Sequence, residues 1–324
     1  MKQLFRASIM LALAGTFSMS VASASAQPLD KLKVAIGGKG LGESGVSEAG
    51  QLAGIFRKHG IDLDIFYTAG SGETQQTVIS GSADIGVATG LLGAVGAYAK
   101  GAPIRVIGAS FTGDANLFWY VRADAPIREP KDAAGKTVSY STNGSSAHNV
   151  VLQMQKYLGV SFKPTATGTG PATFTQVMSG QIDVGWSGAP FGVEALEQGK
   201  IRTLWRASDV PVLAGQTSRV IIAHSDLLRS KPDVVKRYMD AYRETIDWMY
   251  STQEGVKAYA DWASVPVPVA KRTMDEFVTK AGINPDKVSD LAGIMASAVD
   301  FKYVSAPLNA DQIAQFIQIP PRGK

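Results

Sequence analysis

Apolar residues along the chain follow two alternating spacings, one typical of strands and one of helices. Short apolar runs that end in glycine, KLKVAIGG (31–38) and IDLDIFYTAG (61–70), predict buried strands. Between them, SEAGQLAGIFRKHG (47–60) has apolar residues at helical spacing and ends at Gly60. GETQQTVISG (72–81) predicts another helix, and strands are expected in ADIGVATG and PIRVIGAS. Strands that alternate with helices predict a parallel sheet with helices on both faces.

The same order begins again after residue 130. We expect a strand at Thr137–Tyr140, a helix from about Ser146 to Leu158 that ends at Gly159, a helix in PATFTQVMSG and a strand in IDVGWSG. The chain therefore predicts two lobes of one design, with the extended segments 117–122 and 218–225 crossing between them.

The predicted division of the chain follows from this order. Lobe 1 takes residues 27–118, lobe 2 takes residues 119–221, and the mainly helical residues 222–324 return to lobe 1. Ser230 is expected to cap a helix that has Pro232 in its first turn.

One phrase occurs twice, as VISGSADIGVA (78–88) and VMSGQIDVGWS (177–187). In both copies a helix stops at Ser-Gly, and an aspartate, an apolar residue and a glycine follow. Asp84 and Asp183 with their glycines are the residues that turns require, so we assign them to the scaffold.

The first residues predict export. Lys2 and Arg6 precede the apolar stretch Ile9–Val21, and the small residues 24–26 offer a cleavage site before Gln27. We expect a signal peptide, cleaved after Ala26, and a periplasmic mature protein. A membrane anchor is the alternative, but it needs about 20 strongly apolar residues.

Composition excludes several classes of protein. The 324 residues include no cysteine, which excludes thiol nucleophiles and cysteine-ligated metal sites. The three histidines show no metal-ligand spacing and no GxSxG elbow is present, so we expect no metal, no cofactor and no catalytic residues. The net charge is +4, without a run of Lys and Arg, and nucleic acid is not an expected partner.

Several stretches in a fixed order resemble a known family. They are GIFRKHGIDLDI, VISGSADIGVATG with APIRVIGAS, VRADAPIREPKDAAGKTVSYS and VMSGQIDVGWSGAPF, which together cover most of residues 33–200. They are similar to the periplasmic solute-binding proteins of ABC importers, in the branch for sulfonates, taurine, nitrate and thiamine-pyrimidine precursors. The resemblance implies an α/β fold of two Rossmann-like lobes joined by two crossing strands, the type II periplasmic binding protein fold. It also implies a small-molecule ligand between the lobes, a permease partner in the inner membrane, and a monomer.

Candidate ligand contacts come from glycine-rich turns and from the repeated phrase. The turns at 37–45, 68–73 and 141–148 offer backbone N–H groups at helix N-termini, which suit carboxylate, sulfonate or phosphate. Each turn is alternatively an ordinary strand–helix connection with a capping serine. The predicted ligand-binding residues are Gly38, Lys39, Ser71, Gly72, Thr89, Gly90, Trp119, Thr142, Ser145, Ser146, Trp186, Ser187 and Arg219.

Two questions about these residues stay open in the sequence. Lys39 or Arg219 is the candidate for a full counter-charge, although either is alternatively a solvated surface residue. Phe118 and Trp119 are candidates for a pocket wall, and for Trp119 core packing is the alternative. His148 is a candidate for a cleft-facing residue, and an ordinary surface or core histidine is the alternative.

The predicted function is an extracytoplasmic solute-binding protein of an ABC transporter, not an enzyme. Its cargo is expected to be a small organic anion that is a sulfonate, an aromatic carboxylate or pyrimidine-like. One alternative is a periplasmic ligand-sensing subunit. A pyrimidine-precursor synthase on the same fold is another, which the absence of cysteine disfavours because the resemblance gives that enzyme a cysteine-rich iron site.

Overall fold

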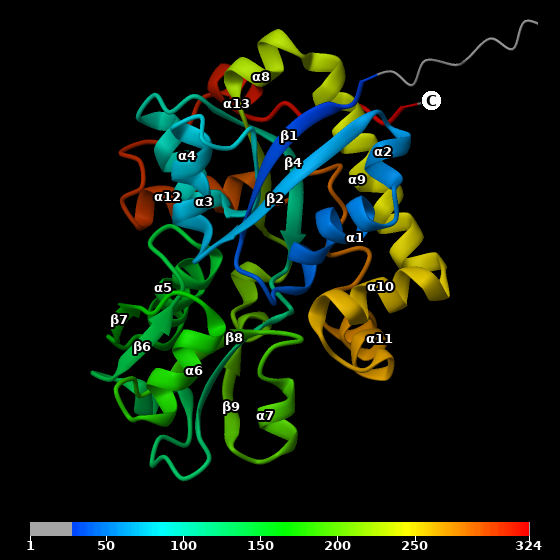
Figure 1. Ribbon diagram of the computed structural model, residues 1–324. Helices are drawn as coiled ribbons and strands as arrows, with labels where there is room; N and C mark the ends of the chain where they lie inside the picture. Colours follow the sequence, from blue (N-terminus) through cyan, green and yellow to red (C-terminus); the bar gives the residue numbers. More distant parts are fainter. Residues whose placement is uncertain (1–27, 324) are drawn as a thin grey trace, which may run out of the picture.

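The computed structural model describes residues 28–323, so the predicted signal peptide and its cleavage site lie outside the described residues. Figure 1 shows two lobes, one above the other, with the yellow to red helices of the C-terminal part packed on the upper lobe. The predicted α/β fold of two lobes is confirmed. Within residues 28–323, no helix combines the length and the apolar character that crossing a membrane requires.

Lobe 1 is built on a five-stranded sheet in the order β2-β1-β3-β10-β4. β1 runs parallel to β2 and β3, whereas β10 runs antiparallel to β3 and β4. The all-parallel sheet predicted from the sequence is therefore wrong at β10, because this strand enters the sheet from the other lobe and not through a helix crossover. The strands are β1 (Asp30–Gly37), β2 (Ile61–Thr68), β3 (Ile85–Gly90), β4 (Ile104–Thr112) and β10 (Thr217–His224).

Helices from both ends of the chain cover this sheet. On one face, α9 (Pro232–Ser251) buries Tyr238 and Tyr242 against the core that includes Phe56 of α2. On the other face, α12 and α13 pack with α4 over Val106 and Val220. The helices are α1 (Val46–Leu52), α2 (Ile55–Lys58), α3 (Ser71–Ile79), α4 (Leu91–Ala99), α8 (Ser225–Ser230), α10 (Gln253–Ala263), α11 (Val267–Glu276), α12 (Leu291–Asp300) and α13 (Ala310–Phe316).

Two local predictions in lobe 1 are wrong. The single helix expected over residues 47–60 is divided into α1 and α2 at Gly54, whose φ of +75° is left-handed and cannot continue a helix. Ser230 does not cap α9. It is the last residue of α8, its hydroxyl donates to the carbonyl of Asp226 in the first turn of that helix, and Lys231 takes the capping position.

Lobe 2 contains a three-stranded sheet, β8-β5-β9, and a two-stranded sheet, β6-β7. In its core Trp119, Trp205 and Phe162 stack in a row, with ring centroids 5.8 Å and 5.6 Å apart. The elements are β5 (Leu117–Arg122), β6 (Thr137–Tyr140), β7 (Lys163–Ala166), β8 (Gly185–Gly188), β9 (Ile201–Arg206), α5 (Ser146–Leu158), α6 (Gly170–Met178) and α7 (Val193–Glu197), with short 3-10 turns at Gly42–Gly45 (in lobe 1), Pro130–Ala133, Ala207–Asp209 and Pro211–Leu213.

Two short segments, residues 113–116 and 214–216, connect the lobes. They lie side by side, because the N–H of Gly113 donates to the carbonyl of Gln216 at 2.9 Å. The segments 117–122 and 218–225, predicted to cross between the lobes, are instead strands inside them. β5 pairs with β8 and β9 in lobe 2, and β10 pairs with β3 and β4 in lobe 1.

The repeated phrase has the same structural role in each lobe. Asp84 accepts a hydrogen bond of 2.8 Å from the backbone N–H of Lys33, which holds β3 beside β1. Asp183 accepts from the backbone N–H and the hydroxyl of Thr137, at 2.9 Å and 2.8 Å, which holds β8 beside β6. The assignment of both aspartates to the scaffold is confirmed.

Candidate ligand-binding site

A cavity lies between the lobes, at the ends of β1, β3 and β8. From lobe 1 it is bordered by the loop after β1 and by the start of α3, and from lobe 2 by the start of α5 and by Trp186. Its volume is about 20 Å³. An organic solute therefore enters only when the lobes move apart, which is the hinge motion of two-lobed binding proteins. Its lining residues are Gly37, Gly38, Leu41, Ala69, Gly70, Ser71, Ala88, Leu117, Ser141, Ser145, Ser146, Ala147, Trp186 and Arg219.

Two helix N-termini border this cavity from opposite lobes. α3 begins at Ser71, whose hydroxyl accepts a 2.6 Å hydrogen bond from the N–H of Gly90. α5 follows Ser145, whose hydroxyl caps the helix by accepting from the N–H of His148. A helix N-terminus presents unpaired N–H groups and a partial positive charge. The two first turns therefore form an environment suited to an anionic group.

Arg219 borders the same cavity and is 1% exposed. Its Nε lies 2.7 Å from Oε1 of Glu43, and its Nη2 lies 3.3 Å from Oδ1 of Asp114. Nη2 also donates to Asn116 at 2.7 Å, and Nη1 donates to the hydroxyl of Ser146 at 3.1 Å. Each of the three guanidinium nitrogens thus lies next to a polar group of the protein.

The carboxylates beside Arg219 are completely enclosed. Glu43 is 0% and Asp114 is 1% exposed, and burial raises the pKa of both carboxyl groups while the charge of Arg219 opposes the rise. Asn116 donates to Oε2 of Glu43 at 3.1 Å, and Ser218 donates to Asp114 at 2.6 Å. Because two carboxyl groups face one guanidinium, Arg219 does not offer a free positive charge to a ligand.

A second chamber, the outer chamber, adjoins the cavity described above, the inner cavity. The outer chamber is the more apolar of the two. The two chambers share Gly38, Leu41 and Trp186, and the second adds Phe191 and Pro171. Trp186 is 4% exposed, and its indole N–H has no hydrogen-bond partner among the described residues. A buried donor without a partner is uncommon, since it loses its hydrogen bond to water. It marks a position where a ligand atom that accepts a hydrogen bond would be stabilised.

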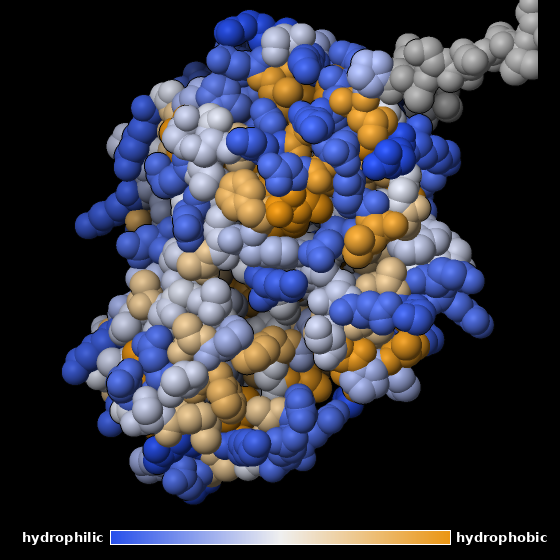
Figure 2. Space-filling view, viewed as in Figure 1, coloured by the Kyte–Doolittle hydropathy of each residue, from blue (hydrophilic) through white to orange (hydrophobic). Residues whose placement is uncertain are grey.

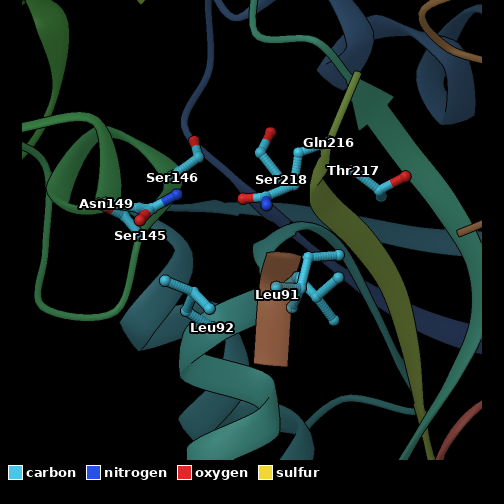
Figure 3. Close-up of a pocket in the computed structure, with 9 residues that line it drawn as sticks. Leu91, Leu92, Ser145, Ser146, Asn149, Gln216, Thr217 and Ser218 are labelled. Carbon is cyan, nitrogen blue, oxygen red and sulfur yellow. The ribbon is translucent and has the colours of Figure 1, made fainter. Parts of the chain in front are cut away.

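The lobes touch around the cavity. The N–H of Gly72 donates to the hydroxyl of Thr142 at 3.0 Å, and the N–H of Gly42 donates to the carbonyl of Ala189 at 3.2 Å. Figure 2 shows hydrophilic residues over most of this face and a waist where the lobes meet. Figure 3 shows a further small pocket beside the lobe connections, where serines at the start of α5 face Gln216 and the start of β10, and Leu91 and Leu92 of α4 also line it.

Seven of the predicted ligand-binding residues lie at the two chambers. Six line the inner cavity, namely Gly38, Ser71, Ser145, Ser146, Trp186 and Arg219, and the seventh, Lys39, lines the outer chamber. Lys39 is exposed, and its ammonium lies 5.3 Å from the centre of the Tyr67 ring. Their contact with a ligand stays a prediction.

The other six lie elsewhere. Thr89 is buried in the sheet and donates to Val220, Trp119 donates to Ser139 inside the core of lobe 2, and Ser187 donates to Phe191. These three side chains are held by their own lobes and do not line the cavity. Gly72, Gly90 and Thr142 lie in the contact between the lobes and not at the cavity.

Sequence reasoning missed the most buried charges of the site. Glu43 lies inside the first glycine-rich turn, and Asp114 lies in the first connection between the lobes. A carboxylate among glycines and apolar residues was the available signal for Glu43. Nothing local marks Asp114, because its partners Ser218 and Arg219 are more than 100 positions away.

Comparison with known proteins decides the family. A family model described as NMT1/THI5 like matches residues 49–256, which is more than half of the chain. The chain belongs to this family. The resemblance noted in the sequence is thereby confirmed.

Several solved structures with this fold are named as periplasmic binding proteins. The periplasmic aliphatic sulphonate binding protein SsuA of Escherichia coli is 21% identical with a TM-score of 0.68, over 91% of this chain and 94% of that one. The alkanesulfonate-binding protein SsuA of Xanthomonas axonopodis pv. citri, bound to MOPS, is 16% identical with a TM-score of 0.73, over 89% and 98%. The periplasmic nitrate-binding protein NrtA of Synechocystis is 15% identical with a TM-score of 0.67, over 89% and 85%. At these identities the likeness establishes the fold.

The curated relatives carry a different name. A 4-amino-5-hydroxymethyl-2-methylpyrimidine phosphate synthase of Uromyces fabae is 22% identical over 231 residues, which are 66% of this chain and 65% of that protein. A protein of the same name from Saccharomyces cerevisiae is 19% identical over 230 residues. The chain thus spans about 65% of the length of the curated relatives that it matches.

Proposed function

We propose that this protein is the extracytoplasmic solute-binding component of an ABC importer. It captures a small organic anion between its lobes and delivers it to a membrane permease. The fold of periplasmic binding proteins supports the general role, and the names of the structural neighbours support the sulfonate and nitrate classes of ligand. The expected periplasmic location and the signal peptide belong to this proposal.

The observation that carries the proposal is the composition of the cavity. Two helix N-termini from opposite lobes, with Ser71, Ser145 and Ser146, provide N–H and hydroxyl donors for an anionic group. Trp186 and Leu41 provide an apolar wall between the two chambers. The cargo is therefore an anion with an apolar or aromatic body, in the range of sulfonate, aromatic carboxylate and pyrimidine-like compounds.

A thermal-shift screen of the purified protein tests the proposal. The solutes are alkanesulfonates, taurine, nitrate, aromatic carboxylates and pyrimidines. A ligand at about 100 times its Kd stabilises the folded state by about 2.7 kcal/mol, which is a clear rise in Tm. We expect a rise with one chemical class and its loss in Trp186→Ala. A folded protein that responds to none of the solutes would contradict the proposal.

The names of the curated relatives favour a second candidate, a pyrimidine phosphate synthase. A carrier releases its ligand unchanged, whereas a synthase yields a new pyrimidine phosphate. Mass spectrometry of the solute recovered from the protein after incubation separates the two, and an unaltered solute supports the carrier.

A further inference from the structure

The charge of the cavity wall carries an inference about the ligand. Among the described residues that line the inner cavity, Arg219 is the one with a charged side chain. Behind it, away from the cavity lining, lie Glu43 and Asp114, at 2.7 Å and 3.3 Å from the guanidinium. A ligand at the cavity thus faces a cation whose charge two buried acidic groups already oppose.

We propose that Glu43 and Asp114 set the charge of the ligand, so that the site accepts neutral and singly charged solutes and rejects dianions. This inference rests on the proposed function and specifies the ligand class of the same site. Helix N-termini and serine hydroxyls carry partial positive charges, which stabilise a negative charge less than a full counter-charge does. A second negative charge has no free cation in the inner cavity and lies close to two carboxyl groups.

The ion pairs and hydrogen bonds of Arg219 show why groups of the protein, and not the ligand, surround it. Nε faces Glu43, Nη2 faces Asn116 and Asp114, and Nη1 donates to Ser146. The ring of Phe111 covers the guanidinium, with Cζ 4.6 Å from the ring centre. Nε and Nη2 face groups of the protein, so an anion can approach Arg219 only at Nη1, beside Ser146, and a bidentate pair that spans two nitrogens is not available.

Glu43→Gln tests this assignment because it replaces the acidic group by a neutral amide and keeps the shape of the side chain. Asp114 still compensates Arg219, so no charge is left buried alone. Coulomb energy is proportional to the charge of the ligand. In Glu43→Gln the affinity for a monoanion should therefore rise by on the order of tenfold. The affinity for a dianion should rise by about the square of this factor, and the affinity for a neutral solute should not change.

The probes share a phenyl ring and differ in charge: benzenesulfonamide is neutral, benzenesulfonate has one negative charge, and phenyl phosphate has about two at pH 8. Their Kd values are measured by isothermal titration calorimetry at pH 8 with the unaltered protein, Glu43→Gln and Asp114→Asn. Glu254→Gln is the control, since it makes the same change of charge at an exposed position outside the cleft.

We expect the unaltered protein to bind benzenesulfonate at least about tenfold more tightly than phenyl phosphate, and Glu43→Gln to narrow this difference. If Glu43→Gln does not fold, the Kd values of the three probes for Asp114→Asn test the assignment in the same way. Equal affinity of the unaltered protein for both anions, or an equal effect of the substitution on all three probes, overturns the assignment. If none of the three probes binds while the solute screen yields another ligand, the charge assignment is overturned and the solute-binding function stands.

Discussion

One added methyl group at Gly90, the last residue of β3, tests whether the lobes close in the arrangement described. Its backbone is extended, with φ of −66° and ψ of 125°, so alanine is not strained there. A Cβ at this position lies 2.2 Å from the carbonyl oxygen of Gly144 and 2.9 Å from Cα of Ser145. Both of these neighbours belong to the other lobe. Gly90→Ala therefore opposes closure and leaves the packing within lobe 1 intact.

The size of the effect follows from the overlap. Ordinary van der Waals contact begins at 3.4 Å, so the two segments must separate by roughly 1.2 Å at this point. Overpacking of this kind costs about 1–3 kcal/mol. If the solute binds in the closed arrangement, its affinity should fall by roughly 5- to 150-fold, because the cost of closure is subtracted from the binding free energy.

Two measurements check this prediction. Calorimetry with the solute from the screen gives the change of Kd, and small-angle X-ray scattering gives the radius of gyration with and without the solute. We expect a larger radius and weaker binding in Gly90→Ala, with an unchanged Tm of the free protein. Gly215→Ala is the matched control, because its Cβ meets no atom within 4 Å and it lies in the second connection. Unchanged affinity in Gly90→Ala would refute closure in the arrangement described.

Three further predictions concern single side chains. Trp186→Phe removes the unpaired indole N–H and keeps an aromatic ring, so calorimetry should show about fivefold weaker binding, the value of one hydrogen bond. Asp183→Ala removes two hydrogen bonds to Thr137 and should lower the free energy of unfolding in urea by about 1–2 kcal/mol, without a change of Kd. Burial lowers the pKa of His148 below its usual value of about 6.5, so the unfolded chain binds the proton more readily. The stability from this difference is present above about pH 6.5 and is lost as the pH falls through the lowered pKa, and His148→Gln should make urea titrations between pH 7 and 5 less dependent on pH.

Local signals were sufficient for many elements of the fold. The helix predicted from Ser146 to Leu158 has these same bounds, because a capping serine and a left-handed Gly159 mark its two ends. The direction of β10 was not predictable in this way. Strand direction depends on where the chain enters the sheet, and β10 enters from lobe 2, after a connection that carries no pattern of its own.

The parts of the candidate site that backbone groups form, the turns and helix N-termini, were predictable from the sequence. Glycine-serine turns indicate helix N-termini wherever a strand leads into a helix, and two of the three turns border the inner cavity at their helix starts. The two tryptophans show the limit of such reasoning. Trp119 and Trp186 are paired across β5 and β8, yet Trp119 stacks on Trp205 in the core and only Trp186 reaches the chambers. Depth within a lobe depends on packing partners that are distant in the sequence.

The position of Arg219 joins ligand charge and lobe movement in one group of residues. Asp114 belongs to the first connection between the lobes, and Arg219 follows the second connection in β10. Ser146, which accepts from Arg219, is the first residue of α5 in lobe 2, whereas Glu43 belongs to lobe 1. Opening of the lobes that separates Ser146 from Arg219 removes a hydrogen bond from a guanidinium that still keeps both carboxylates. Arg219 therefore stays paired with Glu43 and Asp114 while the lobes move, and the hydroxyl of Ser146 is the contact that a ligand can replace.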